Sequence, residues 1–276
     1  SPLHKRQRAM ATVCLPLLGC VTVTPSSSLS TYFHLPSLKN SSSRFLTAAW
    51  KLKCDIDNGH LASVADLAWL LLHGREGLPQ DKAAALKWAQ EGSRRGCPHS
   101  QGVLALCYSS DEWYPMKARS EESLAANQRE ARRLANASAE AGSKYGQFAL
   151  GWILQEEDDE WAASRSATSR CIVQYALAAA QGLDFAQYFL AMALEDQHFE
   201  DKCSSKSEES LRLRYMAAAQ GLPDAFESLA DIVDDWDESI FWHQCALAAG
   251  HCCAEHNLKN ASERAATHFL EEYKDD

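Results

Sequence analysis

Residues 175–195, YALAAAQGLDFAQYFLAMALE, contain the end of one helix, a turn at Gly182 and the start of a second helix. Glycine ends a helix readily because it adopts positive φ without steric cost. Ala186 and Leu190 follow the glycine by about one and two helical turns, so they share one face of the second helix. The stretch therefore predicts a tightly packed helix–turn–helix pair.

The same frame recurs along the chain: a glycine, a small residue four positions later and a leucine eight positions later. The six frames are Gly59–Ser63–Leu67, Gly96–Ser100–Leu104, Gly142–Gly146–Leu150, Gly182–Ala186–Leu190, Gly221–Ala225–Leu229 and Gly250–Ala254–Leu258. A single helix pair cannot bury its apolar face alone, so repeated pairs stack to form a continuous core. We therefore predict an all-α protein, an α-solenoid of about six helix–turn–helix repeats.

Further residues around Gly96 follow the pattern of a known repeat. They are Asp81, Lys82, Ala85, Trp88, Ser100, Gln101 and Leu104. The sequence Ala-Ala-Ala-Gln-Gly also occurs twice, ending at Gly182 and at Gly221. In these residues the chain resembles the Sel1-like repeat family, a relative of the tetratricopeptide repeat, over about residues 46–276. The resemblance implies stacked helix pairs and a role as a scaffold or adaptor.

Charge is distributed unevenly along the chain, whose net charge is −10. Residues 1–54 contain seven basic residues, and all 37 acidic residues follow them. An acidic repeat body argues against general nucleic-acid binding, which requires a positive surface. We predict two parts: a basic, acid-free extended arm or targeting remnant over residues 1–45, and the repeat solenoid over residues 46–276.

The composition of this arm, rich in Ser, Thr, Leu and Pro, fits an organelle-targeting segment and favours a mitochondrion or plastid. A secretory leader is the alternative, because basic residues 5–8 precede an apolar stretch at residues 9–23. A retained basic arm can contact neighbouring subunits, anionic lipid or RNA. No apolar run approaches the roughly 20 residues that span a bilayer as a helix, so we expect no transmembrane helix.

Motifs of catalysis and cofactor binding are missing from the sequence. It contains no phosphate loop, dinucleotide fingerprint, nucleophile elbow or paired-histidine zinc motif. We therefore expect no catalytic residues and no cofactor.

The ten cysteines do not recur in register with the glycine frames. The resemblance implies regular cysteine pairs only in secreted members of the family, so this irregular placement favours free, buried thiols in a reducing compartment. One local group of His and Cys lies at residues 243–256, where Cys252 and His256 are four residues apart on one helix face. The spacing does not specify a complete four-ligand set, and we expect no metal.

Aromatic residues follow two of the glycines at similar positions. Three and six residues after Gly142 and Gly182, and ten residues after them, stand Tyr145, Phe148, Trp152, Phe185, Tyr188 and Met192. These positions share a face distinct from that of the small residue and the leucine. We predict that they line an apolar-aromatic groove for a peptide or helix. The alternative is that the rings pack against the next repeat.

The sequence thus favours a non-catalytic protein–protein interaction scaffold, or an accessory subunit of a larger assembly in an organelle. The alternative is a secreted, disulfide-linked Sel1-like repeat protein with ligand-binding or hydrolase-like activity. Possible glycosylation sites at Asn40, Asn136 and Asn260 fit this alternative. The family resemblance also implies a third option, an adaptor in endoplasmic-reticulum quality control.

Overall fold

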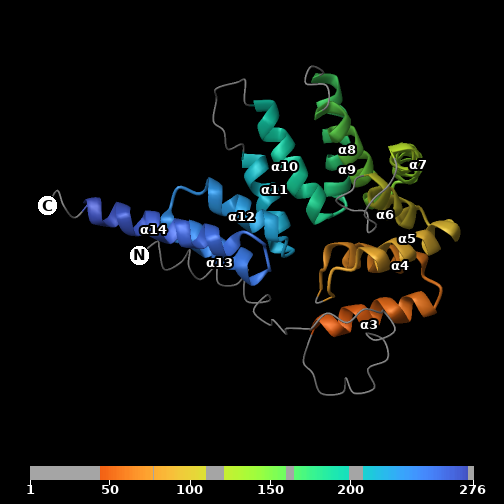
Figure 1. The fold of residues 1–276 in the computed structure, drawn as a ribbon, viewed down its shortest axis with the longest axis horizontal. Helices are drawn as coiled ribbons and strands as arrows, with labels where there is room; N and C mark the ends of the chain where they lie inside the picture. The colour runs from red at the N-terminus through yellow and green to blue at the C-terminus, as the bar shows by residue number, and fades with distance from the viewer. Residues whose placement is uncertain (1–43, 77, 110–120, 160–164, 199–207, 273–276) are drawn as a thin grey trace. The chain divides into compact units, whose positions relative to one another are not determined.

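The computed structural model describes residues 44–76, 78–109, 121–159, 165–198 and 208–272. Within these ranges the chain forms twelve α-helices and no strand (Figure 1). The helices are α3 (Arg44–Asp57), α4 (Leu61–His73), α5 (Lys82–Arg94), α6 (Pro98–Ser109), α7 (Glu121–Glu140), α8 (Lys144–Asp159), α9 (Arg165–Ala180), α10 (Asp184–His198), α11 (Glu208–Ala219), α12 (Pro223–Ile232), α13 (Trp236–Ala248) and α14 (Ala254–Glu272). The predicted all-α fold of six helix pairs is confirmed. Almost all of the predicted arm lies outside the described residues.

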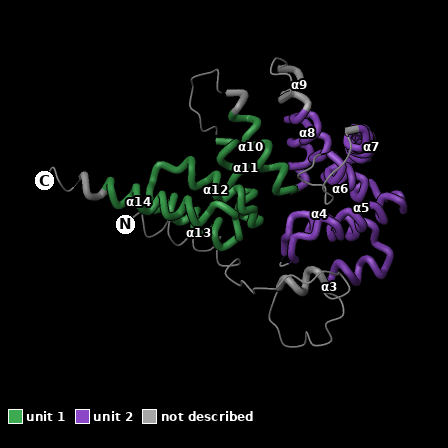
Figure 2. The backbone as a smooth tube through the Cα atoms, viewed as in Figure 1, with its two compact units in different colours: residues 1–20, 182–276 green, residues 21–181 purple. Residues whose placement is uncertain are grey.

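The chain divides into two compact units (Figure 2). Helices α3–α9 belong to one unit, and helices α10–α14 belong to the other. Within each unit, helices that follow one another in the chain pack side by side, and α6 also packs on α4 and α8. Each unit is therefore a stack of successive helices, as expected for an α-solenoid, and the division between the units falls at the turn between α9 and α10. None of the described helices is both long and apolar enough to cross a membrane.

The six frame glycines adopt the predicted left-handed conformation, with φ between 77° and 87°. At Gly142 the backbone N–H donates to the carbonyl of Ala139 over 2.9 Å, and the N–H of Ser143 donates to the carbonyl of Ser138 over 3.1 Å. These two bonds are the Schellman arrangement, which satisfies carbonyls that the end of a helix leaves free. The glycine thus ends one helix and allows the chain to turn into the next.

The small residue of the frame lies where two helices of a pair cross. A Cβ on Gly146 would collide with the side chain of Ser138, and a Cβ on Gly92 would collide with that of Ser100. Neighbouring pairs meet equally closely, because a Cβ on Gly102 of α6 would enter the backbone of α8 at Gly146. Five of the six frame leucines are buried, and Leu258 in the last helix is half-buried. The packing that the frame predicts is therefore present.

A core position seven residues before each glycine changes character along the chain. It holds the buried Ala89 and Ala135 in two early repeats, and then Tyr175, Arg214 and His243, which are also buried. Each polar member has its own partner. The Tyr175 hydroxyl donates to Gln155 over 2.8 Å, Arg214 pairs with Glu195, and His243 Nδ1 lies 2.9 Å from Glu227 Oε2. These partners satisfy the polar groups at this position, which would otherwise be costly to bury.

Candidate partner-binding site

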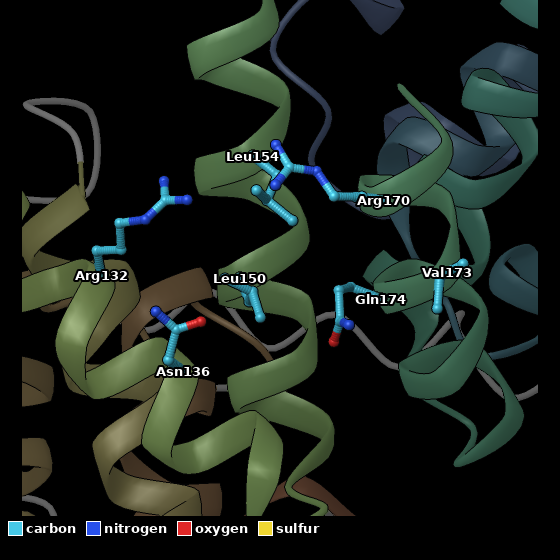
Figure 3. Close-up of a pocket in the computed structure, with 7 residues that line it drawn as sticks. All are labelled: Arg132, Asn136, Leu150, Leu154, Arg170, Val173 and Gln174. Carbon is cyan, nitrogen blue, oxygen red and sulfur yellow. The ribbon is translucent and has the colours of Figure 1, made fainter. Parts of the chain in front are cut away.

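A pocket with a volume of about 520 Å³ lies within the α3–α9 unit, between α7, α8 and α9 (Figure 3). Its size is within the range of roughly 300 to 1,000 Å³ that is usual for binding pockets. Seven side chains line it: Arg132 and Asn136 of α7, Leu150 and Leu154 of α8, and Arg170, Val173 and Gln174 of α9. Each of the three helices therefore contributes a pair of residues four positions apart, about one turn, on a single face, and α9 adds Val173 to its pair.

These pairs form two tiers, which Figure 3 shows. In one tier Arg132 and Arg170 extend from opposite sides towards Leu154. In the other tier Asn136 and Gln174 lie on opposite sides of Leu150. The pocket thus has an apolar floor, a cationic end and an end with two amide groups.

The side chains that line the pocket differ in exposure and in whether they have ion-pair or hydrogen-bond partners. Leu150 and Leu154 are buried, whereas Val173 is 53% exposed at the edge of the pocket. Arg170 is exposed, and it forms no ion pair with the described part of the chain. The Oε1 atom of Gln174 is buried, and no described donor hydrogen-bonds to it. The pocket therefore offers a free cation, a free acceptor and apolar surface to a bound group.

Three of the aromatic residues predicted to line a groove are buried. Tyr145 is 3% exposed, with its ring 4.9 Å from that of Trp69 and its hydroxyl donating to Asp66 over 2.6 Å. Phe148 lies between Trp69 and Tyr175, at ring distances of 5.7 and 5.8 Å. These rings fill the core between repeats, as the packing alternative describes.

The third buried ring is that of Phe185, which is 9% exposed. The other three groove residues lie nearer the surface: Trp152 and Tyr188 are half-buried, and Met192 is 40% exposed. Burial, together with the nearby Asp224 carboxylate, raises the pKa of Tyr188 above its ordinary value. A role of these residues in partner binding stays a prediction.

The sequence did not predict a place in a binding pocket for any of these residues: Leu150 was expected in the core, and the predicted groove consisted of aromatic residues and a methionine after the glycines. The pocket instead uses polar residues in the helices before the glycines. A usable signal was present: α7 and α9 each carry an arginine followed four residues later by a carboxamide, as Arg132–Asn136 and Arg170–Gln174. Two such pairs on successive first helices indicate a shared polar face.

The predicted His and Cys group around Cys252 lies in the α10–α14 unit. Cys252 and His256 are both exposed; the Cys252 Sγ lies 3.5 Å from that of Cys253, and His256 Nε2 lies 3.0 Å from Asn260 Nδ2. Over the described ranges, no group of three or more His, Cys, Asp or Glu side chains is placed to hold a metal ion. His243, from the same stretch, is buried and contacts Glu227.

Seven cysteines fall within the described residues, and none of the seven forms a disulfide there. Cys97, Cys107, Cys171 and Cys245 are buried. Burial raises the pKa of the Cys107 thiol to about 12, which keeps it protonated and unreactive at neutral pH. The alternative of a disulfide-linked protein requires paired cysteines, which these residues do not show.

Comparison with family models gives no match, and neither does comparison with curated proteins. Among solved structures, the chain is similar to a protective antigen of uropathogenic Escherichia coli that displays an SLR fold, with a TM-score of 0.48 and 24% identity. That match covers 79% of this chain but only 44% of the antigen, so the chain spans less than half of its length. A Sel1 repeat protein from Oxalobacter formigenes is similar over 75% of this chain and 87% of its own, with a TM-score of 0.45 and 15% identity.

The all-α fold that the resemblance to Sel1-like repeats implies is present in the described residues. The helix pairs that the pattern predicts are present in this chain, each with a left-handed glycine at its turn. Function has to be argued from the pocket, because one fold serves many functions.

Proposed function

We propose that this chain is a non-catalytic protein-interaction scaffold that holds a segment of a partner protein in the pocket between α7, α8 and α9. The observation that supports this most is what one pocket combines: an arginine without an ion-pair partner among the described residues, an amide oxygen without a donor among them, and exposed apolar surface. An isolated stack of helix pairs needs none of these for stability. They match what a bound peptide requires, which is a few fixed polar contacts beside apolar surface.

The apolar surface continues beyond the pocket along α9. Val173 lines the pocket, and Leu177, one turn later on the same face, is 46% exposed. A segment longer than the pocket therefore has further apolar surface to cover. This favours a protein segment over a small molecule as the bound group.

The proposal extends to a role as an accessory subunit of a larger assembly in an organelle. Its support is the acid-free, basic composition of residues 1–54. Contacts of this stretch with neighbouring subunits, anionic lipid or RNA remain predictions from composition.

Site-specific photo-cross-linking in cells of the native source tests the scaffold role. A benzophenone amino acid at position 173 is compared with the same amino acid at position 176, since Ala176 is exposed on α9 but does not line the pocket. We expect a discrete protein adduct from position 173 and none from position 176. Identical adducts from both positions, or no adduct from either, would contradict a docking role for the pocket.

An occluding substitution provides the second arm. Asn136→Trp should fill the pocket and abolish the adduct from position 173, whereas Ala137→Trp, at an exposed neighbour outside the pocket, should leave it unchanged. Circular dichroism of both variants verifies that the helices remain folded.

A further inference from the structure

We infer that the partner segment is acidic and amphipathic: it carries Asp or Glu next to an aliphatic side chain. This rests on the proposed function, since it names the chemistry of the group bound in the same pocket. The carboxylate would lie between Arg132 and Arg170, and the aliphatic side chain would lie on Leu150, Leu154 and Val173.

The two arginines at the cationic end of the pocket determine the charge of the partner segment. Arg132 and Arg170 approach the pocket from opposite sides, and a guanidinium binds a carboxylate through two parallel hydrogen bonds. Arg170 has no ion-pair partner in the described ranges, so a bound carboxylate would be its first. The pocket thereby selects an anionic side chain.

The rest of the chain favours a short acidic protein segment over a nucleic acid. With a net charge of −10, the chain repels a polyanion that extends beyond the pocket. A short segment meets only the pocket itself, where Arg170 has no ion-pair partner among the described residues. An aliphatic side chain also fits the floor of Leu150 and Leu154, which a phosphate backbone would leave uncovered.

The side-chain amides of Asn136 and Gln174 favour a ligand that has a polypeptide backbone beside its carboxylate. Gln174 Oε1 is buried, no donor in the described part of the chain reaches it, and a main-chain N–H of the segment can supply one. The exposed amide of Asn136 lies on the other side of Leu150 and can pair with a main-chain group from there. A buried acceptor that is satisfied only on binding adds to specificity, because a ligand without an N–H leaves it unpaired.

Selection from a random library of eight-residue peptides displayed on phage tests the inference on the full chain. We expect the wild type to enrich peptides with Asp or Glu adjacent to Leu, Ile or Val. The leading peptide, made with a fluorescein label, should bind with a Kd that rises at least tenfold in Arg170→Glu. Arg129→Glu is the matched control: it reverses an exposed arginine on α7 outside the pocket, and its Kd should be unchanged.

Further probes separate charge from folding and from other anions. Replacing each acidic residue of the peptide by its amide should weaken binding to the wild type but not to Arg170→Glu. Because Arg170 is exposed, its reversal should leave the thermal midpoint unchanged. A fluorescein-labelled single-stranded oligonucleotide that bound more tightly than the peptides, and lost binding in Arg170→Glu, would overturn the inference.

Failure of the inference can be told from failure of the proposed function. Selected peptides that lack acidic residues, yet lose binding to Asn136→Trp, would overturn the acidic segment while supporting the pocket as a docking site. Peptides whose binding is insensitive to both Arg170→Glu and Asn136→Trp would contradict both.

Discussion

Arg214 and Glu195 form a bidentate ion pair that joins α11 to α10: Nη2 lies 2.7 Å from Oε2, and Nη1 bonds to the other carboxylate oxygen. The Arg214 side chain is buried, and its remaining donors reach Ser228 Oγ at 2.6 Å and Ser210 Oγ at 2.7 Å. The pair therefore links three helices of the α10–α14 unit through one guanidinium. Such a network is costly to break, because removal of the carboxylate leaves the buried guanidinium unpaired.

Glu195→Ala should destabilise the protein by about 3 kcal/mol, since it leaves the Arg214 guanidinium without its carboxylate. Urea denaturation followed by circular dichroism measures the change. Arg212→Ala is the control, because Arg212 lies on the same helix in an exposed ion pair with Glu209 and should contribute little. Equal effects of the two substitutions would show that the buried pair has no special role.

The same pair predicts a pH dependence of stability. Burial alone would raise the pKa of the Glu195 carboxyl, but hydrogen bonds from Arg214 and Ser210 and the charge of Arg214 outweigh it, so the pKa lies below its ordinary value of 4.5. A carboxyl with a lowered pKa stabilises the fold fully above the pKa of the unfolded chain, and this contribution is lost as the pH falls through the folded value. The difference in unfolding free energy between wild type and Glu195→Gln should therefore be constant above about pH 5 and shrink below pH 4.5. A difference that stayed constant down to pH 3 would argue against the assignment.

Glutamines connect successive repeats in both units. Gln181 Nε2 donates to Gln147 Oε1 over 2.7 Å, and Gln220 Nε2 donates to Gln187 Oε1 over 2.9 Å. Gln220→Ala should cost about 1 to 3 kcal/mol, because Gln187 is buried and its oxygen loses its donor. Adding Gln187→Leu should recover part of that loss, and a double-mutant cycle measures the coupling. Additive losses would mean that the two amides do not interact.

Two glycines of the α7–α8 pair should respond differently to alanine. At Gly142 a Cβ would meet nothing within 4 Å, so Gly142→Ala costs only the left-handed backbone conformation, about 1 kcal/mol. Gly146→Ala should cost more, because the added methyl group collides with Ser138. Thermal denaturation of both variants gives the order. Introducing Ser138→Gly should partly rescue Gly146→Ala and have no such effect on Gly142→Ala.

Thiol reactivity should follow burial. Cys252 and Cys253 are exposed, whereas Cys107 is buried with a pKa raised to about 12. At pH 8, iodoacetamide should label the exposed pair in the native protein and reach Cys107 only after unfolding, as peptide mass spectrometry reports. Protection of the native Cys252 and Cys253 that is lifted by a reducing agent would instead support the disulfide-linked alternative.

The parts of the fold that sequence could predict are those fixed by neighbouring residues. Gly142 and Gly182 end their helices, and the residues four and eight positions later face the core, because helix geometry alone places them. The Arg214–Glu195 pair could not be predicted, since the two residues come together only after α10 and α11 have packed. The pocket likewise forms only when α7, α8 and α9 have packed together, because its lining residues come from all three helices.

The aromatic prediction shows where periodicity is insufficient. Tyr145 and Phe148 do share a helix face, as their spacing indicates. In a stack of helix pairs, however, an inner helix contacts neighbours on several faces, so a second apolar face can also be core. Trp69 and Tyr175 cover these rings, and neither contact is visible in the spacing around Gly142.

The polar residues seven positions before the later glycines restrict how this array can change in evolution. Arrays commonly gain and lose whole members, which requires that one member can replace another. Ala89 and Ala135 impose no condition on their neighbours at this position. Arg214 and His243 do, because each has its own acidic counterpart in the preceding part of the chain, so excision or duplication of a pair there would leave a buried polar side chain facing the wrong partner. The number and order of helix pairs around α10–α13 are thereby fixed by interactions in the core.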